Sequence, residues 1–435
     1  MPQTDFHHPK KRSPFNQVLV FMLLLLISSV TGLPIENRNK MNNVFTYDVV
    51  IIGGAIMGSS AAFWLSRMNP DLDILVIEPD PSYAKSSTAL SVASVRQQFT
   101  TAVNVEISRF GINFIKNVQV WLGQGGGVDS LGFQENGYLF LSGSAQSETV
   151  LRQACAMQCE KGAQTELLTP DALKARFDWL NVDDIHLASF GAKDEGWFDN
   201  MSLLGGFRKA AQHQGVKFLR DRVVAIEGTN SRISSVKLES TGTIFAANII
   251  NAAGTSANDI LEMLGEGLPV EPRKRTVFMI DAPNAIHPDA PLMVCHSGFY
   301  LRPEHNHWIC AIVPKDDHRA EKDDFEPDLH LFEDSLWPKL YERAPGFDAV
   351  KVLSAWAGHY AYNTLDQNAI IGRHQNWHNL FLMNGFSGHG LQQAPAVGRG
   401  IAELVLHGAY QTIDLSDLGV DRILEGRPFA EKAIV

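Results

Sequence analysis

The chain has 435 residues, 45% of them hydrophobic and 20% charged, which excludes a disordered, collagen-like or polytopic membrane protein and predicts two or three domains. The 48 acidic and 37 basic residues give a net charge of −11, so the overall positive charge typical of nucleic-acid-binding proteins is absent. The four cysteines include no Cys-x-x-Cys pair, and we interpret them as small buried hydrophobic residues rather than as a disulfide framework.

We expect residues 1–45 to lie outside the fold. A basic cluster at 10–12 precedes an apolar run at 18–27, which small residues follow. This order is typical of a signal peptide. It also fits a marginal membrane anchor, because the run is shorter than the ~18–20 residues of a full span. A third interpretation is that a natural chain begins at Met41, just before the first predicted strand.

A strand–turn–helix–strand unit follows. The predicted strands cover 48–52 and 73–77, and a helix rich in small residues is expected at 59–68 between them. This arrangement is typical of a dinucleotide-binding unit, in which the helix N-terminus faces a pyrophosphate. The residues that we expect to contact the cofactor in this turn are Gly53, Gly54, Ala55, Met57 and Gly58.

Each residue type in this turn has a physical task. Gly53 permits the tight turn and Gly58 permits close packing of the helix on the strand, whereas Ala55 departs from the glycine usual at its position. Glu78, at the end of the second strand, can accept hydrogen bonds from the adenosine ribose. An acid there argues against the 2′-phosphate of NADP, so NAD and FAD both fit this unit.

A second glycine-rich unit near the other end of the chain favours FAD. A strand is predicted at 381–383, and the helix that follows continues through Val405. The N-terminus of this helix would face the edge of a flavin ring, where reduced flavin is negative. The loop at 79–99, with Arg96 near its end, can run along the ring. The expected cofactor contacts of the second unit are Gly388, His389, Gly390, Leu391 and Gln392.

The middle of the chain predicts a second domain that is interleaved with the first. Helices are expected at 170–177 and 200–212, and a charge-rich solvated loop is expected at 316–324. Strand patterns that we assign to an antiparallel sheet occur near 132–142 and at 276–280, 298–302 and 308–313. Further strand patterns occur at 216–226 and, as two runs, within 233–254.

Taken together, these motifs resemble those of the glycine/D-amino-acid oxidase superfamily of flavoproteins. The more specific similarity, to one group within it, lies in six phrases spread in order over 94–416: SVRQQF, DEGWFD, LPVEPRKR, SAWAGHYAYNTLDQNAIIG, GFSGHGLQQAP and QTIDLS. The resemblance implies an α/β fold, with a Rossmann-type FAD-binding domain on a mixed or parallel sheet and an interleaved antiparallel-sheet substrate domain. It also implies that Ser87, Val224, Ala253 and Gly254 contact the cofactor.

The domain boundaries that we expect follow from this resemblance. The FAD-binding domain is predicted at 46–130, 195–275 and 355–410, and the substrate domain at 131–194 and 276–354, with a C-terminal tail at 411–435.

The resemblance implies oxidation of a C–N bond in a small amine, with hydride passing to flavin N5. Relatives carry an Arg that binds the substrate carboxylate after the stretch matching Trp356-Ala357-Gly358, but here His359 and Tyr360 follow. The cysteine that binds flavin covalently in sarcosine oxidases is absent, so non-covalent FAD is expected. Their lysine that assists reaction with O₂ is also absent near Cys310, which favours a dehydrogenase. The catalytic candidates are Arg96, His359 and Tyr360, and no metal is expected.

The resemblance also suggests an alternative to catalysis. The animal member of the group with the more specific similarity is a mitochondrial protein that takes part in assembling respiratory complex I. This implies an FAD-stabilised scaffold with little turnover, with complex I subunits as partners. As an enzyme, the protein would pass electrons to an acceptor protein or a quinone. A mitochondrial location is expected for a eukaryotic protein, and a cytoplasmic or membrane-associated one for a bacterial protein. An NAD-dependent dehydrogenase is a third, weaker hypothesis.

Overall fold

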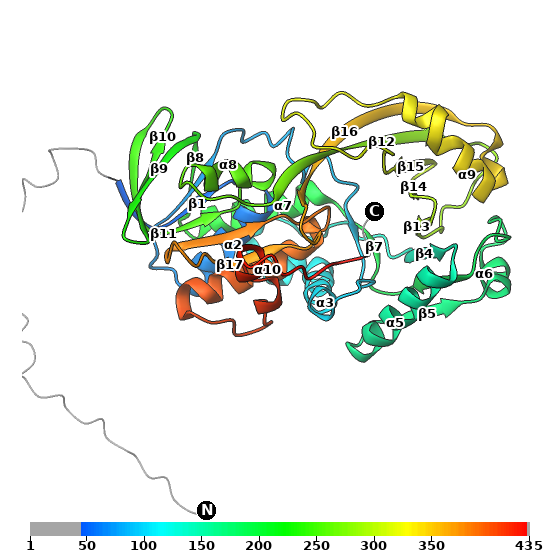
Figure 1. Cartoon of the computed structure of the whole chain (residues 1–435), viewed down its shortest axis with the longest axis horizontal. Helices are drawn as coiled ribbons and strands as arrows, with labels where there is room; N and C mark the ends of the chain where they lie inside the picture. Colours follow the sequence, from blue (N-terminus) through cyan, green and yellow to red (C-terminus); the bar gives the residue numbers. More distant parts are fainter. Residues whose placement is uncertain (1–44, 433–435) are drawn as a thin grey trace, which may run out of the picture. The chain divides into compact units, whose positions relative to one another are not determined.

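The computed structural model describes residues 45–432. The N-terminal segment predicted at 1–45 therefore lies outside the described residues, except for Phe45, which begins the first strand. The last three residues of the tail predicted at 411–435 also lie outside them. Within the described range, no helix has both the length and the apolar character that a membrane span needs. The secondary structure is a mixture of helices and strands, as the predicted α/β class requires (Figure 1).

The first large sheet contains the predicted strand–turn–helix–strand unit. Its strands follow the order β17-β18-β11-β1-β2-β8, and β9 and β10 extend it beside β11. The pairs β1–β2, β2–β8 and β11–β18 are parallel, while β17–β18 and the pairs of β10 are antiparallel. The strands are β1 (Phe45–Ile52), β2 (Ile74–Glu78), β8 (Lys217–Arg220), β9 (Val223–Thr229), β10 (Arg232–Leu238), β11 (Gly242–Asn251), β17 (Ile370–Arg373) and β18 (Leu380–Asn384).

Helices from distant parts of the chain pack together on this sheet. The rings of Phe63, Phe114 and Phe207, from three different helices, lie 5.0–6.4 Å apart between centroids. Burial of such rings supplies a large hydrophobic contribution to the fold. The helices associated with this sheet are α2 (Ile56–Met68), α3 (Ala102–Lys116), α4 (Val118–Gly126), α7 (Asn200–His213), α8 (Ala257–Glu262) and α10 (Gly390–His407).

The second large sheet has the order β16-β12-β15-β14-β13-β4-β6-β5. It is antiparallel as predicted, with one exception, because β13 and β4 run parallel. Their pairing joins two segments that are remote in sequence, which local patterns do not reveal. The strands are β4 (Tyr138–Ser142), β5 (Thr165–Leu168), β6 (Leu187–Gly191), β12 (Val270–Asp281), β13 (Leu292–Val294), β14 (Phe299–Glu304), β15 (His307–Ile312) and β16 (Lys351–Asn363).

The remaining elements are short or lie beside the second sheet. A small ribbon pairs β3 with β7, and three further helices lie near the strands just described, while α11 is close to the C-terminus. These elements are β3 (Ser94–Val95), β7 (Gly196–Trp197), α5 (Ala145–Glu160), α6 (Pro170–Arg176), α9 (Trp337–Arg343) and α11 (Asp421–Leu424), with short η helices at Gly254–Ser256, Phe332–Leu336, Pro345–Asp348 and Ser416–Leu418.

Strands β12 and β16 connect the two sheets. They pair continuously from Val270 opposite Asn363 to Asp281 opposite Lys351, with one irregularity near Met279. Val270 belongs to the apolar core of the first sheet, while Phe278 belongs to that of the second. Figure 1 shows both strands as long arcs that reach from the region of α8 toward α9. The division into two domains at the predicted boundaries stays a prediction.

Two sequence-based expectations about this architecture are wrong in detail. The strand predicted at 216–226 is divided into β8 and β9, because the Asp221 carboxylate accepts hydrogen bonds from the backbone N–H groups of Arg222, Ser240 and Thr241 and shapes a turn there. All four cysteines are free, but Cys159 is exposed rather than buried, since α5 buries only a narrow face.

The contact between α2 and α10 generates a stability prediction. A Cβ on Gly398 would lie 2.2 Å from Ser60 Oγ and 2.8 Å from the Ser60 carbonyl carbon, so Gly398→Ala forces the two helices apart. Overpacking of this kind costs about 1–3 kcal/mol. We expect a lower Tm by calorimetry. Gly205→Ala in α7, where a Cβ meets nothing within 4 Å, is the control and should keep or raise Tm. An unchanged Tm in both variants would contradict this packing.

Candidate active site

The turn after β1 has no room for side chains at two glycines. Gly53 has a φ of +99°, and a Cβ there would lie 2.4 Å from the carbonyl oxygen of Ala252. A Cβ on Gly58 would lie 1.8 Å from the carbonyl oxygen of Gly53. The turn is therefore as tight as the sequence predicts. It also lies against the chain that leaves β11, which includes the predicted cofactor contacts Ala253 and Gly254.

The N-terminus of α2 lacks a side-chain cap. Its capping residue is Ala55, and the Ile56 N–H in the first turn donates a long hydrogen bond of 3.4 Å to Thr88 Oγ1. Unsatisfied N–H groups and the positive end of the helix dipole make such a terminus a site for an anion. The predicted contact Met57 lies in this first turn.

Glu78 is fixed beside the same turn. One carboxylate oxygen accepts a 2.8 Å hydrogen bond from the Gly54 N–H and the other accepts one of the same length from the Asp80 N–H. The nearby Tyr83 hydroxyl is buried without a hydrogen-bond partner among the described residues, and burial raises its pKa to about 12. A buried, unsatisfied hydroxyl next to an uncapped helix and an oriented carboxylate fits the adenosine and pyrophosphate half of a dinucleotide.

The second glycine turn meets the first. Helix α10 begins at Gly390, and the side chain of its capping residue, His389, accepts no hydrogen bond from the N–H groups of the first turn. A Cβ on Gly390 would lie 3.1 Å from the Met57 side chain, so the beginnings of α10 and α2 are in contact. Two further bonds hold the helices together, from Ser60 Oγ to the Ala394 carbonyl at 2.7 Å and from Trp64 Nε1 to the Pro395 carbonyl at 2.9 Å.

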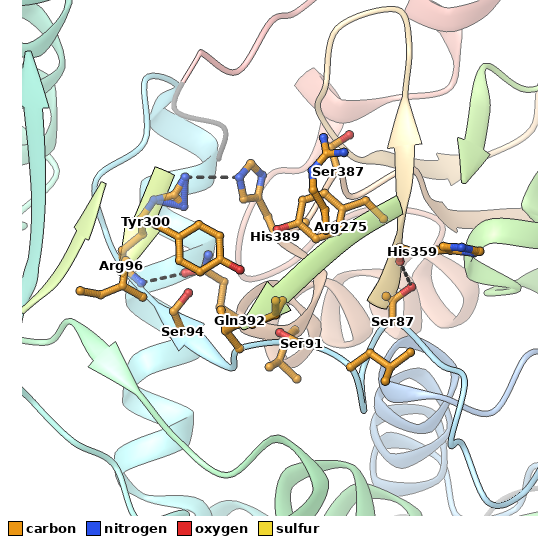
Figure 2. Close-up of a pocket in the computed structure, with 18 of the residues that line it drawn as sticks. Ser87, Ser91, Ser94, Arg96, Arg275, Tyr300, His359, Ser387, His389 and Gln392 are labelled. Carbon is orange, nitrogen blue, oxygen red and sulfur yellow. Dashed lines mark hydrogen bonds between the residues drawn. The ribbon is translucent and has the colours of Figure 1, made fainter. Parts of the chain in front are cut away.

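A pocket lies next to these turns. The space between its walls, including the part open to solvent, is about 780 Å³. Loop 87–96, the face of β12 and β16, and the second glycine turn all contribute to the walls (Figure 2). The lining residues are Ser87, Leu90, Ser91, Val92, Ser94, Arg96, Tyr138, Arg275, Val277, Leu292, Tyr300, Gly358, His359, Tyr360, Ser387, Gly388, His389, Leu391 and Gln392.

Arg96 is held at one wall of the pocket. Its Nη2 lies 3.3 Å from His389 Nε2, and its backbone N–H donates to Gln392 Oε1 at 2.9 Å (Figure 2). The guanidinium also lies over the Phe99 ring, 4.2 Å from the centroid. Loop 87–96 and α10 are thus joined at the pocket, and three of the predicted site residues are in contact with one another.

Tyr360 and His359 point to opposite faces of β16. The Tyr360 ring packs against Gly388, where a Cβ would lie 2.6 Å from it. The His359 ring instead stacks on Phe325 and its Nε2 lies 2.7 Å from the Asp324 carbonyl oxygen, while burial lowers its pKa. His359 contributes to the pocket wall through its carbonyl oxygen, which accepts a 2.6 Å bond from Ser87 Oγ (Figure 2).

The structure brings most, but not all, of the predicted cofactor contacts together. Ser87, Gly388, His389, Leu391 and Gln392 share the pocket. Val224 lies on β9 with a side chain that is 42% exposed, and it is not among the pocket residues. The roles of all these residues stay predictions.

Sequence reasoning missed two charged residues of this region. Arg275 lines the pocket and lies directly across the β12–β16 pair from Gly358. Its signal was the phrase LPVEPRKR, which immediately precedes a predicted strand. Glu195, in the phrase DEGWFD, is buried, accepts bonds from the Gln97 N–H at 2.7 Å and Gln98 Nε2 at 2.8 Å, and has a pKa that burial raises to about 8.

This arrangement fits the binding of an elongated, negatively charged cofactor. Within residues 45–432, no group of three or more His, Cys, Asp or Glu side chains is placed to hold a metal ion. Two uncapped helix N-termini in contact can serve an elongated ligand that is negative at more than one point. The adjacent pocket, with its tyrosines and arginines, can hold a small polar molecule.

Comparisons with known proteins agree with this geometry. The sequence model of the family DAO, FAD dependent oxidoreductase, matches residues 48–404. The chain is 37% identical over 426 residues to FAD-dependent oxidoreductase domain-containing protein 1 of Bos taurus, covering 89% of this chain and 87% of that one. It is 23% identical to monomeric sarcosine oxidase of a Bacillus species, covering 86% and 96% of the two chains.

A solved structure is also similar. L-proline dehydrogenase from P. horikoshii superimposes with a TM-score of 0.78 at 25% identity, covering 88% of this chain and all of that one.

The buried Glu195 predicts how stability depends on pH. Its pKa near 8 in the folded protein exceeds the ordinary value of 4.5, so the folded state binds more protons than the unfolded state between these values. Stability should therefore fall as pH rises through this window, by up to about 1.4 kcal/mol per unit, and the loss is complete above pH 8.

The measurement that checks this expectation is the Tm of the wild type and of Glu195→Gln at several pH values between about 5 and 9, in the same buffers for each protein. The variant should lose the fall in Tm toward alkaline pH that the wild type shows. Glu239→Gln, at an exposed position, is the matched control and should retain it. A Glu195→Gln protein with the same slope as the wild type would exclude Glu195 as its source.

Proposed function

Since the chain belongs to the family of FAD-dependent oxidoreductases and FAD is its cofactor, we propose that it oxidises a C–N bond in a small amine of the N-methyl amino acid type. The observation that carries the proposal is the contact between the two uncapped helix N-termini beside the pocket. Similarity to a sarcosine oxidase and to an L-proline dehydrogenase supports an amine as the substrate.

The residues described above suit the parts of FAD. We propose that the turn at 53–58 and the N-terminus of α2 bind the pyrophosphate, that Glu78 binds the ribose, and that the N-terminus of α10 binds the carbonyl edge of the flavin. When bound, FAD supplies the chemistry by accepting hydride from the carbon next to the amine nitrogen. The protein contributes the binding, orientation and exclusion of water.

Arg96 and Tyr360 are the side chains that we propose for orienting the substrate. Arg96 is positioned by His389 and Gln392, and Tyr360 by Gly388, so both are held with little freedom at the pocket wall. A fixed guanidinium and a fixed phenol each supply hydrogen-bond donors in a set orientation. The His359 imidazole, whose contacts are on the other face of β16, would act through the position of its backbone.

We propose that the enzyme is a dehydrogenase rather than a fast oxidase. The residues that line the pocket include no lysine, the residue type that assists the reaction with O₂ in sarcosine oxidases. Electrons would then pass to an acceptor protein or a quinone. The eukaryotic relatives are compatible with a mitochondrial location, which is part of the proposal.

A second candidate function is that of an FAD-stabilised assembly factor for respiratory complex I. The observation that favours it is the state of Arg275, whose guanidinium is paired with Asp317 of the same chain in the described pocket. In this case FAD would serve mainly to stabilise the fold, by mass action on the folded state.

An anaerobic titration of the FAD-loaded protein tests the main proposal. We expect at least one of sarcosine, L-proline and related N-methyl amino acids to bleach the flavin absorbance at about 450 nm, with a rate constant on the order of 1–10 per second. A protein that holds FAD but stays oxidised with the whole panel would contradict amine oxidation and favour the assembly factor.

Tyr360→Phe should slow flavin reduction without loss of FAD. The phenol donates one neutral hydrogen bond, worth about 1–1.5 kcal/mol, so the rate constant should fall about tenfold. Stopped-flow absorbance measures this rate, and the ratio of the flavin absorbance to the protein absorbance measures the FAD content. Tyr341→Phe, on the exposed face of α9, is the control that should change neither quantity. Equal rates for both variants would remove Tyr360 from the substrate site.

A further inference from the structure

Arg275 occupies a position from which it can act on the contents of the pocket. It lies on β12 with its side chain 6% exposed, and its guanidinium is 5.2 Å from the centroid of the Tyr360 ring. It is the residue opposite Gly358, where the neighbouring strand has no side chain to cover it. Figure 2 shows Arg275 among the residues that line the pocket.

The guanidinium has one strong partner, which comes from a surface loop. Asp317 accepts two hydrogen bonds, from Nη1 at 2.7 Å and from Nη2 at 2.8 Å. Nη1 also donates a 3.0 Å bond to the Lys274 carbonyl oxygen, while Nε is buried and has no hydrogen-bond partner among the described residues. A buried guanidinium with an unused N–H has room for a further acceptor, which a carboxylate supplies.

Asp317 has a second cation beside it, Arg273, which also pairs with Glu271. The Asp317 side chain is 24% exposed and one carboxylate oxygen already lies 4.0 Å from Nη1 of Arg273, the next-but-one residue on β12. The rest of the loop is anchored independently, because Lys274 pairs with Asp324 at 2.8 Å and with Asp328 at 2.9 Å. A local shift of Asp317 from Arg275 toward Arg273 therefore needs no opening of the whole loop.

We propose that Arg275 binds the negatively charged group of the substrate and that Asp317 takes the place of that group when the pocket is empty. This inference rests on the proposed function and names a feature of its substrate, a carboxylate or similar planar anion. The exchange replaces one carboxylate by another on a buried cation, so the charge of Arg275 is balanced in both states.

The other arginines near the pocket are bound differently. Arg302 donates to the carbonyl oxygens of Pro303 and Val92 and pairs with the adjacent Glu304 on the same strand. Arg96 is held between His389 and the ring of Phe99. The acid that pairs with Arg302 lies on the same strand, whereas the acid that pairs with Arg275 comes from a surface loop. This difference makes Arg275 the arginine whose partner can be exchanged.

Calorimetric titration of the FAD-loaded protein tests the exchange. The probes are benzoate and its uncharged counterpart benzamide, neither of which is an amine substrate. Arg275→Gln should weaken benzoate binding by about tenfold or more, because it removes a hydrogen-bonded charge. Asp317→Asn should tighten benzoate binding by about tenfold, because it removes the competing carboxylate. Benzamide should bind all variants alike.

Two controls separate this result from a general effect on folding or charge. Asp324→Asn removes a carboxylate of the same loop that pairs with Lys274, and it should leave benzoate affinity unchanged. Arg275→Lys retains the charge but not the planar pair of donors, so it should bind benzoate with an intermediate affinity. FAD content and Tm, measured for each variant, show that the proteins are folded.

Benzoate affinity that is the same in wild type, Arg275→Gln and Asp317→Asn would overturn the proposal, as would a failure of every variant to bind benzoate. The titration needs no turnover. A protein that shows the predicted pattern but never reduces its flavin with an amine would retain the anion site and lose the proposed function. A protein that oxidises amines without the pattern would lose only this inference.

Discussion

The structure depends on the close contact between the beginnings of two helices that are more than three hundred residues apart in the chain. Each helix begins without a side-chain cap, and each follows a turn in which glycine is required by space. Two uncapped N-termini in contact leave several N–H groups unsatisfied and place two positive dipole ends side by side. A ligand with separate negative regions, such as FAD, can accept hydrogen bonds from these N–H groups and offset the two positive dipole ends.

The second sheet acts on the same region through β12 and β16. These strands begin or end in the core of the first sheet and continue into the core of the second, so they carry pocket residues at a fixed distance from the helix N-termini. Arg275 and Tyr360 are on neighbouring strands of this pair, and Gly388 fits against the Tyr360 ring. The substrate wall and the cofactor turns are therefore parts of one packed unit.

Local patterns in the sequence were sufficient for the elements and the cofactor. The apolar run that forms β1, the glycines after it and Glu78 are close together in sequence, and their spacing is typical of a dinucleotide-binding unit. These residues predicted a dinucleotide, the second glycine-rich unit favoured FAD, and the family resemblance implied the α/β fold; the FAD cofactor and the fold class are confirmed. The contact of the two glycine turns was also expected, because both units predicted helix N-termini for one ligand.

The residues that the sequence did not reveal depend on pairing between remote strands. Arg275 faces the pocket because β12 pairs with β16 in one particular register. Asp317 contacts Arg275 from a loop whose sequence indicates only a charged, solvated segment. Glu195 is buried by contacts with Gln97 and Gln98, which are distant in sequence. His359 and Tyr360 were both candidates, although alternation along a strand allows only one of two neighbours to face the pocket.

Hydrogen–deuterium exchange with and without FAD tests the central claim most directly, because it reports on backbone N–H groups at both turns in the intact protein. The account predicts that adding FAD slows exchange both at 53–58 and at 388–392, with the β5–α6 region, which contributes no residue to the described pocket, as an unaffected internal reference. Slower exchange at only one of the two turns would show that a single helix N-terminus holds the cofactor and would contradict the account.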